Sequence, residues 1–233
     1  EIMPSLVGSE MCIRDRSNVT AFDSTGFLKW SKNLGQVTMP GLALDNRGNI
    51  IIIEGPQGVG KSTMANFLRD NLASSNLYRL TGIKDKSQTG YAKNKKMYLN
   101  LLNYMETLEE TELNLIFDRT FFTEQVYASL GFKDYKFDDV YKRLVQKLND
   151  LDYNIYFVVL YLEDTSLYEK RLVRQHHQYQ AFSLESSIKQ QNAYLKLADD
   201  LNMPNIKVLK IATDNYEEAY NNCLLYTSPS PRD

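Results

Sequence analysis

Residues 50–63, IIIIEGPQGVGKST, are the stretch that decides the fold of this chain. Residues 50–53 form a short β-branched run that ends near a glycine, which is typical of a buried strand. Beyond the loop, Met64, Phe67 and Leu72 recur on one face of a helical pattern. The order of elements is therefore expected to be strand, glycine-rich turn and helix.

The spacing within the turn predicts a loop that holds a phosphate chain. It matches the pattern G-x-x-x-x-G-K-[ST], in the strand-to-helix context that this pattern requires. The backbone amides and the positive end of the helix dipole favour an anion. Lys61 is expected to reach the β- and γ-phosphates, and the Ser62 hydroxyl is expected to ligate Mg²⁺. The alternative is a turn that binds nothing. The expected ATP-binding residues are Gly55, Gln57, Gly58, Val59, Gly60, Lys61, Ser62 and Thr63.

The two ends of the chain are related to each other at the level of their coding DNA. Residues 6–15, LVGSEMCIRD, and residues 223–233, CLLYTSPSPRD, can be coded by opposite strands of one sequence. That DNA resembles a transposon-derived adapter used in sequencing libraries, so the ends are excluded from the fold prediction. Residues 1–16 and 223–233 are expected to be adapter-like tails, and a natural inverted repeat is the alternative.

Composition narrows the classes of function. The chain has 233 residues and a formal net charge of −2, which gives no basis for binding polymeric nucleic acid by charge. Both cysteines, Cys12 and Cys223, fall in the expected tails, so no disulfide or thiol chemistry is expected. No apolar run approaches about 18 residues, which argues against a transmembrane helix.

Residues 17–48 differ in pattern from the segment that begins at residue 49. The strings AFDSTGFLKW and PGLALDNRGNI alternate apolar and polar residues around Asp-x-x-Gly turns and include the only tryptophan, Trp30. The pattern resembles one blade of a quinoprotein-type β-propeller. Because one blade cannot bury its own faces, we expect a chimera of two coding fragments joined between Gly48 and Ile51. An ordinary hairpin packed on the neighbouring domain is the alternative.

From residue 49 to residue 222, apolar strand-like segments alternate with helical ones. The strands are expected at residues 49–54, 76–80, 113–118, 154–162 and 206–211. This pattern predicts one α/β domain, a doubly wound parallel five-stranded sheet with helices on both faces. The segment before it adds an N-terminal β-rich part.

The third expected strand ends in Asp118-Arg119. A carboxylate at that place, beside a phosphate-binding loop, can hold Mg²⁺ or accept a proton from an attacking hydroxyl. The neighbouring arginine can bridge the oxygens of a second phosphate. A surface ion pair that caps the strand is the alternative.

Residues 118–127, DRTFFTEQVY, resemble D-R-Y-x-x-S-x-x-A-Y of thymidylate kinases and the related [DE]-R-S-x-x-S of deoxynucleoside kinases. The matching positions are Asp118, Arg119, Thr123, Val126 and Tyr127. The resemblance spans Ile50 to about Asp214 and implies a P-loop kinase with ATP and Mg²⁺ as cofactors, the metal held by Ser62 and Asp118. It also implies a cytoplasmic location without a membrane partner, and it leaves a homodimer open.

The chain departs from thymidylate kinases around the substrate sugar and base. Gln57 stands where E-G-x-D-G-x-G-K has aspartate, and Thr120 stands where tyrosine is expected. The R-E-P-G-G string is replaced by residues 79–82, RLTG. By resemblance, the expected substrate-binding residues are Gln57, Arg79, Tyr98, Arg119 and Tyr127.

Two helical segments add further candidates by resemblance. Arg171 and Arg174 come after the fourth strand, where nucleotide kinases carry a lid whose arginines neutralise the transferring phosphoryl group. A solvated helix face is the alternative. Tyr98 and Tyr104 lie in residues 90–108, the helix that lines the acceptor site in this family, and core packing is their alternative.

These residues predict ATP-dependent phosphoryl transfer to a nucleoside monophosphate, with a pyrimidine deoxynucleotide as the favoured acceptor. The expected catalytic residues are Lys61, Asp118, Arg119, Arg171 and Arg174. One alternative is a deoxynucleoside kinase acting on the 5′-hydroxyl, and another is a P-loop ATPase or nucleotide switch acting on a protein partner. The latter class commonly has glutamate where Arg119 stands. A third alternative is a non-functional chain of joined fragments.

Overall fold

The computed structural model describes residues 47–80, 82–173 and 183–227, together with the backbone of four strands between residues 5 and 33. The chain divides into two compact units. One comprises residues 1–46 and 229–233, and the other comprises residues 47–228. Among the described residues, every helix is too short or too polar to cross a bilayer.

The first unit contains a four-stranded antiparallel sheet, which confirms the expected β-rich N-terminal part. Its strands are adjacent in space in chain order, as β1 (Ser5–Val7), β2 (Glu10–Asp15), β3 (Asn18–Phe22) and β4 (Leu28–Asn33). The β3–β4 register shifts between Ala21 and Phe22. The propeller-blade resemblance of residues 17–48 and the adapter-like origin of residues 1–16 stay predictions.

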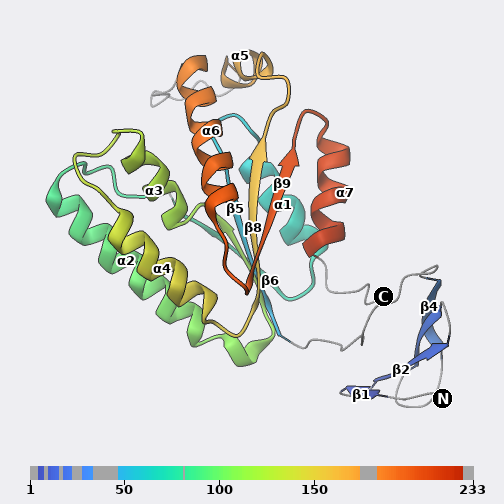
Figure 1. The fold of residues 1–233 in the computed structure, drawn as a ribbon. Coiled ribbons are helices and arrows are strands. Elements are labelled where there is room, and N and C mark those ends of the chain that lie inside the picture. The colour runs from blue at the N-terminus through green and yellow to red at the C-terminus, as the bar shows by residue number, and fades with distance from the viewer. Residues whose placement is uncertain are drawn as a thin grey trace. The chain divides into compact units, whose positions relative to one another are not determined.

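The second unit is built on a five-stranded sheet, as predicted (Figure 1). The strands are β5 (Asn49–Glu54), β6 (Ser75–Arg79), β7 (Asn114–Asp118), β8 (Asn154–Tyr161) and β9 (Ile206–Ala212). Their order is β6-β7-β5-β8-β9, and every pair is parallel. Because β5 is central, the loop after it lies at the carboxyl edge of the sheet between β7 and β8.

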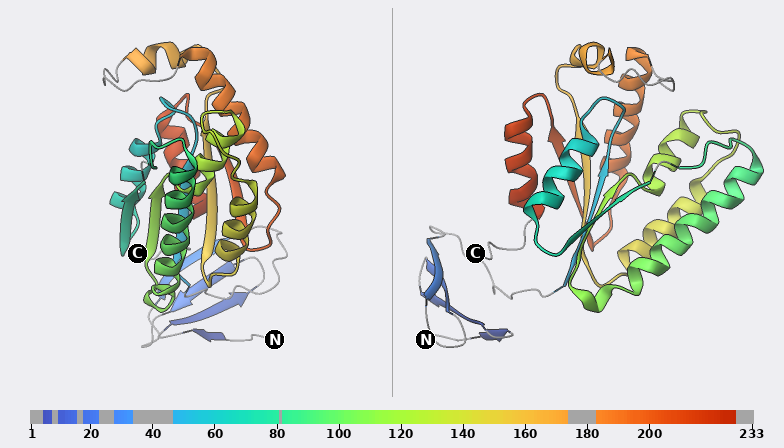
Figure 2. Two further views of the ribbon diagram at one scale, coloured as in Figure 1. Left: turned by 90° about the vertical axis from the view of Figure 1, so that its left-hand side faces the viewer. Right: turned by 180° about the vertical axis from the view of Figure 1, so that it is seen from behind.

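Helices cover both faces of this sheet (Figure 2). One face carries α1 (Lys61–Asn71) and α7 (Tyr216–Thr227), and α5 (Leu167–Val173) lies beyond the carboxyl edge of the sheet and adds side chains to the same core. The other carries α2 (Gln88–Glu106), α3 (Phe121–Ser129), α4 (Asp138–Asn149) and α6 (Leu184–Asp200), with the short 3-10 helix η1 (Glu109–Thr111) after α2. The predicted doubly wound α/β class is confirmed.

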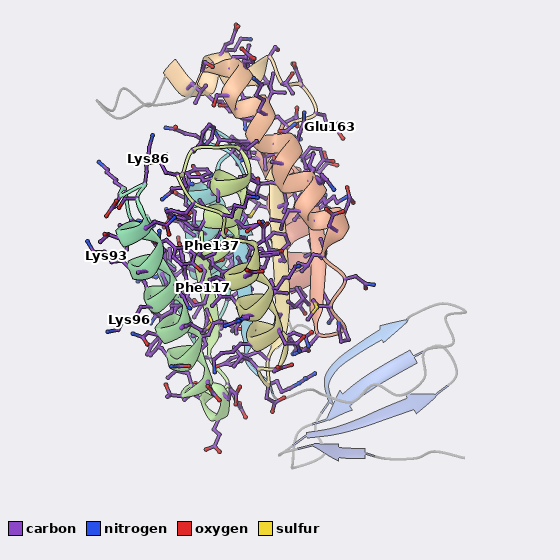
Figure 3. All side chains as sticks on the ribbon, turned by 60° about the vertical axis from the view of Figure 1, so that its left-hand side comes forward. Lys86, Lys93, Lys96, Phe117, Phe137 and Glu163 are labelled. Atoms are coloured by element: carbon purple, nitrogen blue, oxygen red, sulfur yellow. The ribbon has the colours of Figure 1, made fainter. Side chains whose placement is uncertain are left out.

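The isoleucine run of β5 supplies two hydrophobic cores. Ile50 and Ile52 pack in the core of α2, α3, α4 and α6, whereas Ile51 and Ile53 pack with α1, α5 and α7. Successive strand side chains point to opposite faces, so a continuous apolar run suits a strand that is buried on both sides. Figure 3 labels Phe117 of β7, which packs in the first of these cores.

Helix α7 continues past residue 222, where the sequence places the end of the domain. It ends at Thr227, and Cys223 is buried in the core that contains α1. On the same side, the rings of Phe67 and Tyr220 stack with their centroids 4.3 Å apart. The helical layer of the second unit thus includes residues that the sequence assigns to an adapter-like tail.

Candidate active site

The loop between β5 and α1 has backbone conformations that favour glycine. Gly55, Gly58 and Gly60 have φ angles of 142°, 85° and 95°. A Cβ at Gly55 would lie 2.5 Å from the carbonyl oxygen of Leu160, and one at Gly60 would lie 2.6 Å from the ring of Tyr216. The glycines therefore allow both the turn and the close approach of β8 and α7.

Lys61 opens α1 and lies inside the loop. Its Nζ donates to the carbonyl oxygen of Pro56 at 2.5 Å, and the residue is buried. Burial lowers the pKa of Lys61 well below its ordinary value and Arg119 adds to this effect, while Asp118 and Glu54 oppose it. A polyanion in the loop would favour the charged ammonium, so this site is suited to a phosphate chain.

Ser62 and Asp118 meet where α1 begins and β7 ends. The Ser62 Oγ donates to Oδ2 of Asp118 at 2.6 Å. The parallel pairing of β5 and β7 brings them together, because it places Asp118 opposite Ile53. A hydroxyl and a carboxylate are ligands that Mg²⁺ accepts when phosphates and waters complete its octahedron. The donor set fits Mg²⁺, although the described ranges hold no group of three or more His, Cys, Asp or Glu residues suited to a metal.

Arg119 comes directly after Asp118 and has a left-handed backbone, φ 76°. Its N–H donates to the carbonyl oxygen of Ile53 at 3.1 Å, and its Nη1 donates to the hydroxyl of Tyr127 at 3.1 Å. Burial opposes the charge, but Tyr127, Tyr194 and Glu54 outweigh it and raise the pKa of Arg119. The guanidinium is therefore a permanent positive charge beside the glycine-rich loop.

Glu54 is a buried carboxylate behind this site, and the sequence patterns did not select it. It ends β5 and is 0% exposed. It accepts hydrogen bonds from the Thr120 N–H at 2.7 Å and from the Thr123 Oγ1 at 2.5 Å. Burial raises the pKa of Glu54 to about 7, against the opposing effects of Thr123 and Arg119. A glutamate directly after four buried strand positions is the sequence signal that could have revealed it.

Arg171 lies on the opposite side of the loop, where α5 meets the end of β9. Its Nη2 donates to the carbonyl oxygen of Thr213 at 2.7 Å, and its guanidinium carbon lies 4.6 Å from the ring centroid of Tyr216. The Thr213 Oγ1 donates to the carbonyl oxygen of Val59 at 2.8 Å, which ties the loop to β9. No motif marked Thr213 or Tyr216 in the sequence. Arg174 lies outside the described residues.

The aromatic candidates on α2 occupy different surroundings. Tyr98 is 1% exposed, and its ring packs edge-on against Phe121 and Phe137 in the core. Tyr104 is 43% exposed and shares a 2.9 Å hydrogen bond with the hydroxyl of Tyr78. Among the described residues, neither hydroxyl forms a hydrogen bond with Arg119.

The two remaining substrate candidates stand near the carboxyl edge of the sheet. Arg79 ends β6 opposite Asp118, and its guanidinium donates to the side chain of Asn66 on α1. Gln57 is a partly buried residue of the glycine-rich loop itself. Arg79 thus contacts the loop-bearing helix, while Tyr127 is the candidate that contacts Arg119 directly.

A second polar cluster, between α2 and α3, also escaped the sequence patterns. The Asn94 Nδ2 donates to the Tyr135 hydroxyl at 2.9 Å, Tyr135 donates to Glu124, and Lys133 forms a 2.9 Å ion pair with Glu124. The Oδ1 of Asn94 is buried and has no hydrogen-bond partner among these contacts. An unpaired buried acceptor is costly. A polar residue on the apolar face of α2 is the sequence signal that could have revealed this cluster.

No protein-family model matches the sequence, and no curated protein matches it. Solved structures do. The Bacillus subtilis YorR protein, in complex with phosphorylated GDP, is 19% identical with a TM-score of 0.56, over 76% of this chain and 94% of that one. Thymidylate kinase from Candida albicans is 16% identical with a TM-score of 0.54, over 77% and 91%. Polyphosphate Kinase 2 from Arthrobacter aurescens is 11% identical with a TM-score of 0.55, over 78% and 66%.

At these identities the likeness concerns the fold. The second unit has the α/β architecture of P-loop nucleotide kinases, which agrees with the fold implied by the resemblance of residues 50–63 and 118–127. The acceptor and the reaction are therefore argued from the site itself.

Proposed function

We propose that the domain expected at residues 49–222 transfers the γ-phosphoryl group of ATP to a nucleoside monophosphate. The observation that carries this proposal is the meeting of the two sequence motifs at one edge of the sheet. The Ser62 Oγ donates to Asp118 at 2.6 Å, and the backbone N–H of Arg119 donates to the carbonyl oxygen of Ile53, in the strand that leads into the loop, at 3.1 Å. A phosphate loop, a metal-ligand pair and a permanent cation are thereby adjacent.

Phosphoryl transfer requires mainly positioning and charge neutralisation. The loop amides and Lys61 would hold the β- and γ-phosphates of ATP, and Ser62 and Asp118 would hold Mg²⁺. When bound, Mg²⁺ neutralises charge on the phosphate oxygens. Arg119 orients the phosphate of the acceptor, and Arg171 adds positive charge from the α5 side of the loop. The proposed roles of Lys61, Asp118, Arg119 and Arg171 are supported by the hydrogen bonds that these side chains make around the loop.

Two observations favour a monophosphate over a nucleoside as acceptor. First, Asp118 is engaged with Ser62 at 2.6 Å, which suits a metal ligand better than a base for a 5′-hydroxyl. Second, residues 118–127 fit all ten positions of the thymidylate kinase spacing, whereas the shorter deoxynucleoside kinase pattern covers only residues 118–123. The cation is then placed for a second phosphate, which only a nucleotide acceptor provides.

An acceptor screen with γ-labelled ATP tests the proposal on the full chain, with nucleosides, nucleoside monophosphates and water in parallel. We expect label in a nucleoside diphosphate, and none with Lys61→Ala. Label in a nucleoside monophosphate formed from a nucleoside would support the deoxynucleoside kinase alternative. Release of label as inorganic phosphate alone would support the ATPase alternative, and the absence of all three would contradict a phosphotransferase.

A further inference from the structure

The backbone of Arg119 is in a conformation that side chains rarely adopt, φ 76°. Such a conformation persists only where the surroundings impose it. Two hydrogen bonds do so here, one on each side of the residue. The Arg119 N–H donates to the carbonyl oxygen of Ile53 at 3.1 Å, and the Thr120 N–H donates to Oε1 of Glu54 at 2.7 Å. Both acceptors belong to β5, the strand that leads into the phosphate loop.

The carboxylate of Glu54 also holds the first turn of α3. Its Oε1 accepts a further hydrogen bond from the Thr120 Oγ1 at 3.2 Å, and its Oε2 accepts one from the Thr123 Oγ1 at 2.5 Å. Thr120 is the N-cap of α3, yet its own side chain makes no capping hydrogen bond. Glu54, which lies on β5, therefore supplies the hydrogen-bond acceptor and the negative charge that the N-terminus of α3 favours.

The hydrogen bonds of Glu54 to the start of α3 continue to a third element, α6. The Thr123 Oγ1 shares a 2.9 Å hydrogen bond with the hydroxyl of Tyr194 on α6, and Tyr194 is 0% exposed. The charged and titratable side chains that interact with Glu54 are Lys61 of α1, Arg119, Tyr98 of α2, Tyr141 of α4 and Tyr194 of α6. Glu54 is thus enclosed on the protein side of the site, whereas Arg119 is only partly buried.

We propose that Glu54 is the positioning residue for Arg119. Its hydrogen bonds to Thr120 and Thr123 hold the start of α3, so that the left-handed backbone of Arg119 directs the guanidinium at the phosphate of the acceptor. Glu54 is fully buried and acts through Arg119 rather than on a substrate. The direction of the guanidinium toward an acceptor phosphate rests on the proposed function, while the anchoring contacts do not.

Two substitutions at residue 54 separate anchoring from charge. Glu54→Ala removes every hydrogen bond to Thr120 and Thr123. Glu54→Gln keeps a carbonyl oxygen for the Thr120 N–H, and its amide can donate to the Thr123 hydroxyl. We expect Glu54→Ala to raise the acceptor KM about tenfold, because a misdirected guanidinium loses a charge-assisted contact. The ATP KM should change less than about threefold, and Glu54→Gln should restore the acceptor KM to within about threefold of the parent.

A rise of both KM values together, no rise at all, or a Glu54→Gln variant that behaves like Glu54→Ala would each overturn the proposal. Thr123→Val serves if Glu54→Ala does not fold, because it removes one donor at nearly constant volume. It should raise the acceptor KM about threefold, and an unchanged value would count against the anchor.

The Nε–H resonance of Arg119 in a ¹⁵N NMR spectrum provides a readout that needs no substrate. We expect it to be sharp in the parent and in Glu54→Gln and broadened in Glu54→Ala. If the parent phosphorylates no acceptor, the proposed function fails, and this resonance still decides the positioning role. An Arg119 resonance that is the same in all three proteins would overturn it.

Discussion

The buried carboxyl of Glu54 should make the stability of the second unit depend on pH. Its pKa rises from an ordinary 4.5 to about 7 in the folded chain, chiefly through burial. Between these values the folded state binds more protons than the unfolded state, so stability falls as pH rises. The stability that the protonated Glu54 contributes is fully present below about pH 4.5 and is lost as the pH rises through about 7.

The magnitude is set by the two pKa values. A difference between 4.5 and about 7 corresponds to about 3 kcal/mol over the whole titration, of which about 2.5 kcal/mol falls between pH 5 and pH 8. Glu54→Gln removes the titrating group. The free energy of unfolding of the parent, measured relative to this variant, should therefore decrease by about 2.5 kcal/mol over that range.

Urea unfolding monitored by the helical circular dichroism signal measures this difference at pH 5, 6, 7 and 8. The signal is suitable because every helix among the described residues lies in the second unit. Glu163→Gln is the matched control, since it makes the same substitution at an exposed glutamate near the same edge of the sheet (Figure 3). Parallel pH profiles for the parent and Glu54→Gln would refute a titrating carboxyl at this position.

Three further substitutions test the site. Lys61→Ala should reduce phosphoryl transfer at least about a hundredfold and weaken ATP binding in calorimetry, while the circular dichroism spectrum stays unchanged. Turnover equal to that of the parent would contradict the loop assignment. Asp118→Asn should raise the Mg²⁺ concentration for half-maximal rate about tenfold or more, because it removes the negative charge from the proposed Mg²⁺ ligands Ser62 and Asp118. An unchanged Mg²⁺ titration would exclude Asp118 as a ligand. Arg119→Ala should lower kcat/KM for a monophosphate about 10- to 150-fold and affect a nucleoside far less, and equal steady-state losses for both acceptors would argue for the deoxynucleoside kinase alternative.

Local sequence patterns were sufficient for the strands of the second unit. The run at residues 50–53 and the segment at residues 154–161 are apolar and β-branched or aromatic, and buried parallel strands require this composition. The glycine-rich turn between β5 and α1 was equally predictable, because Gly55, Gly58 and Gly60 lie where the backbone takes positive φ angles.

Contacts between distant segments were beyond those patterns. Thr213 reaches Val59 across 154 residues of sequence, and α7 adds the buried Cys223 that the sequence patterns had assigned to a tail. Neither contact can be predicted from a repeat or a fixed spacing in the sequence, because the residues involved are far apart along the chain.

The sequence by itself determined the order of strands and helices, the loop that suits a phosphate chain and the Asp118-Arg119 pair, because each depends on residues adjacent along the chain. Only the tertiary structure decided that Ser62 meets Asp118, and that Glu54 holds Thr120 and Thr123 from 66 and 69 residues away. The physical reason is that the burial of a carboxylate and the partners that make it tolerable are set by the packing of β5 against β7 and α3.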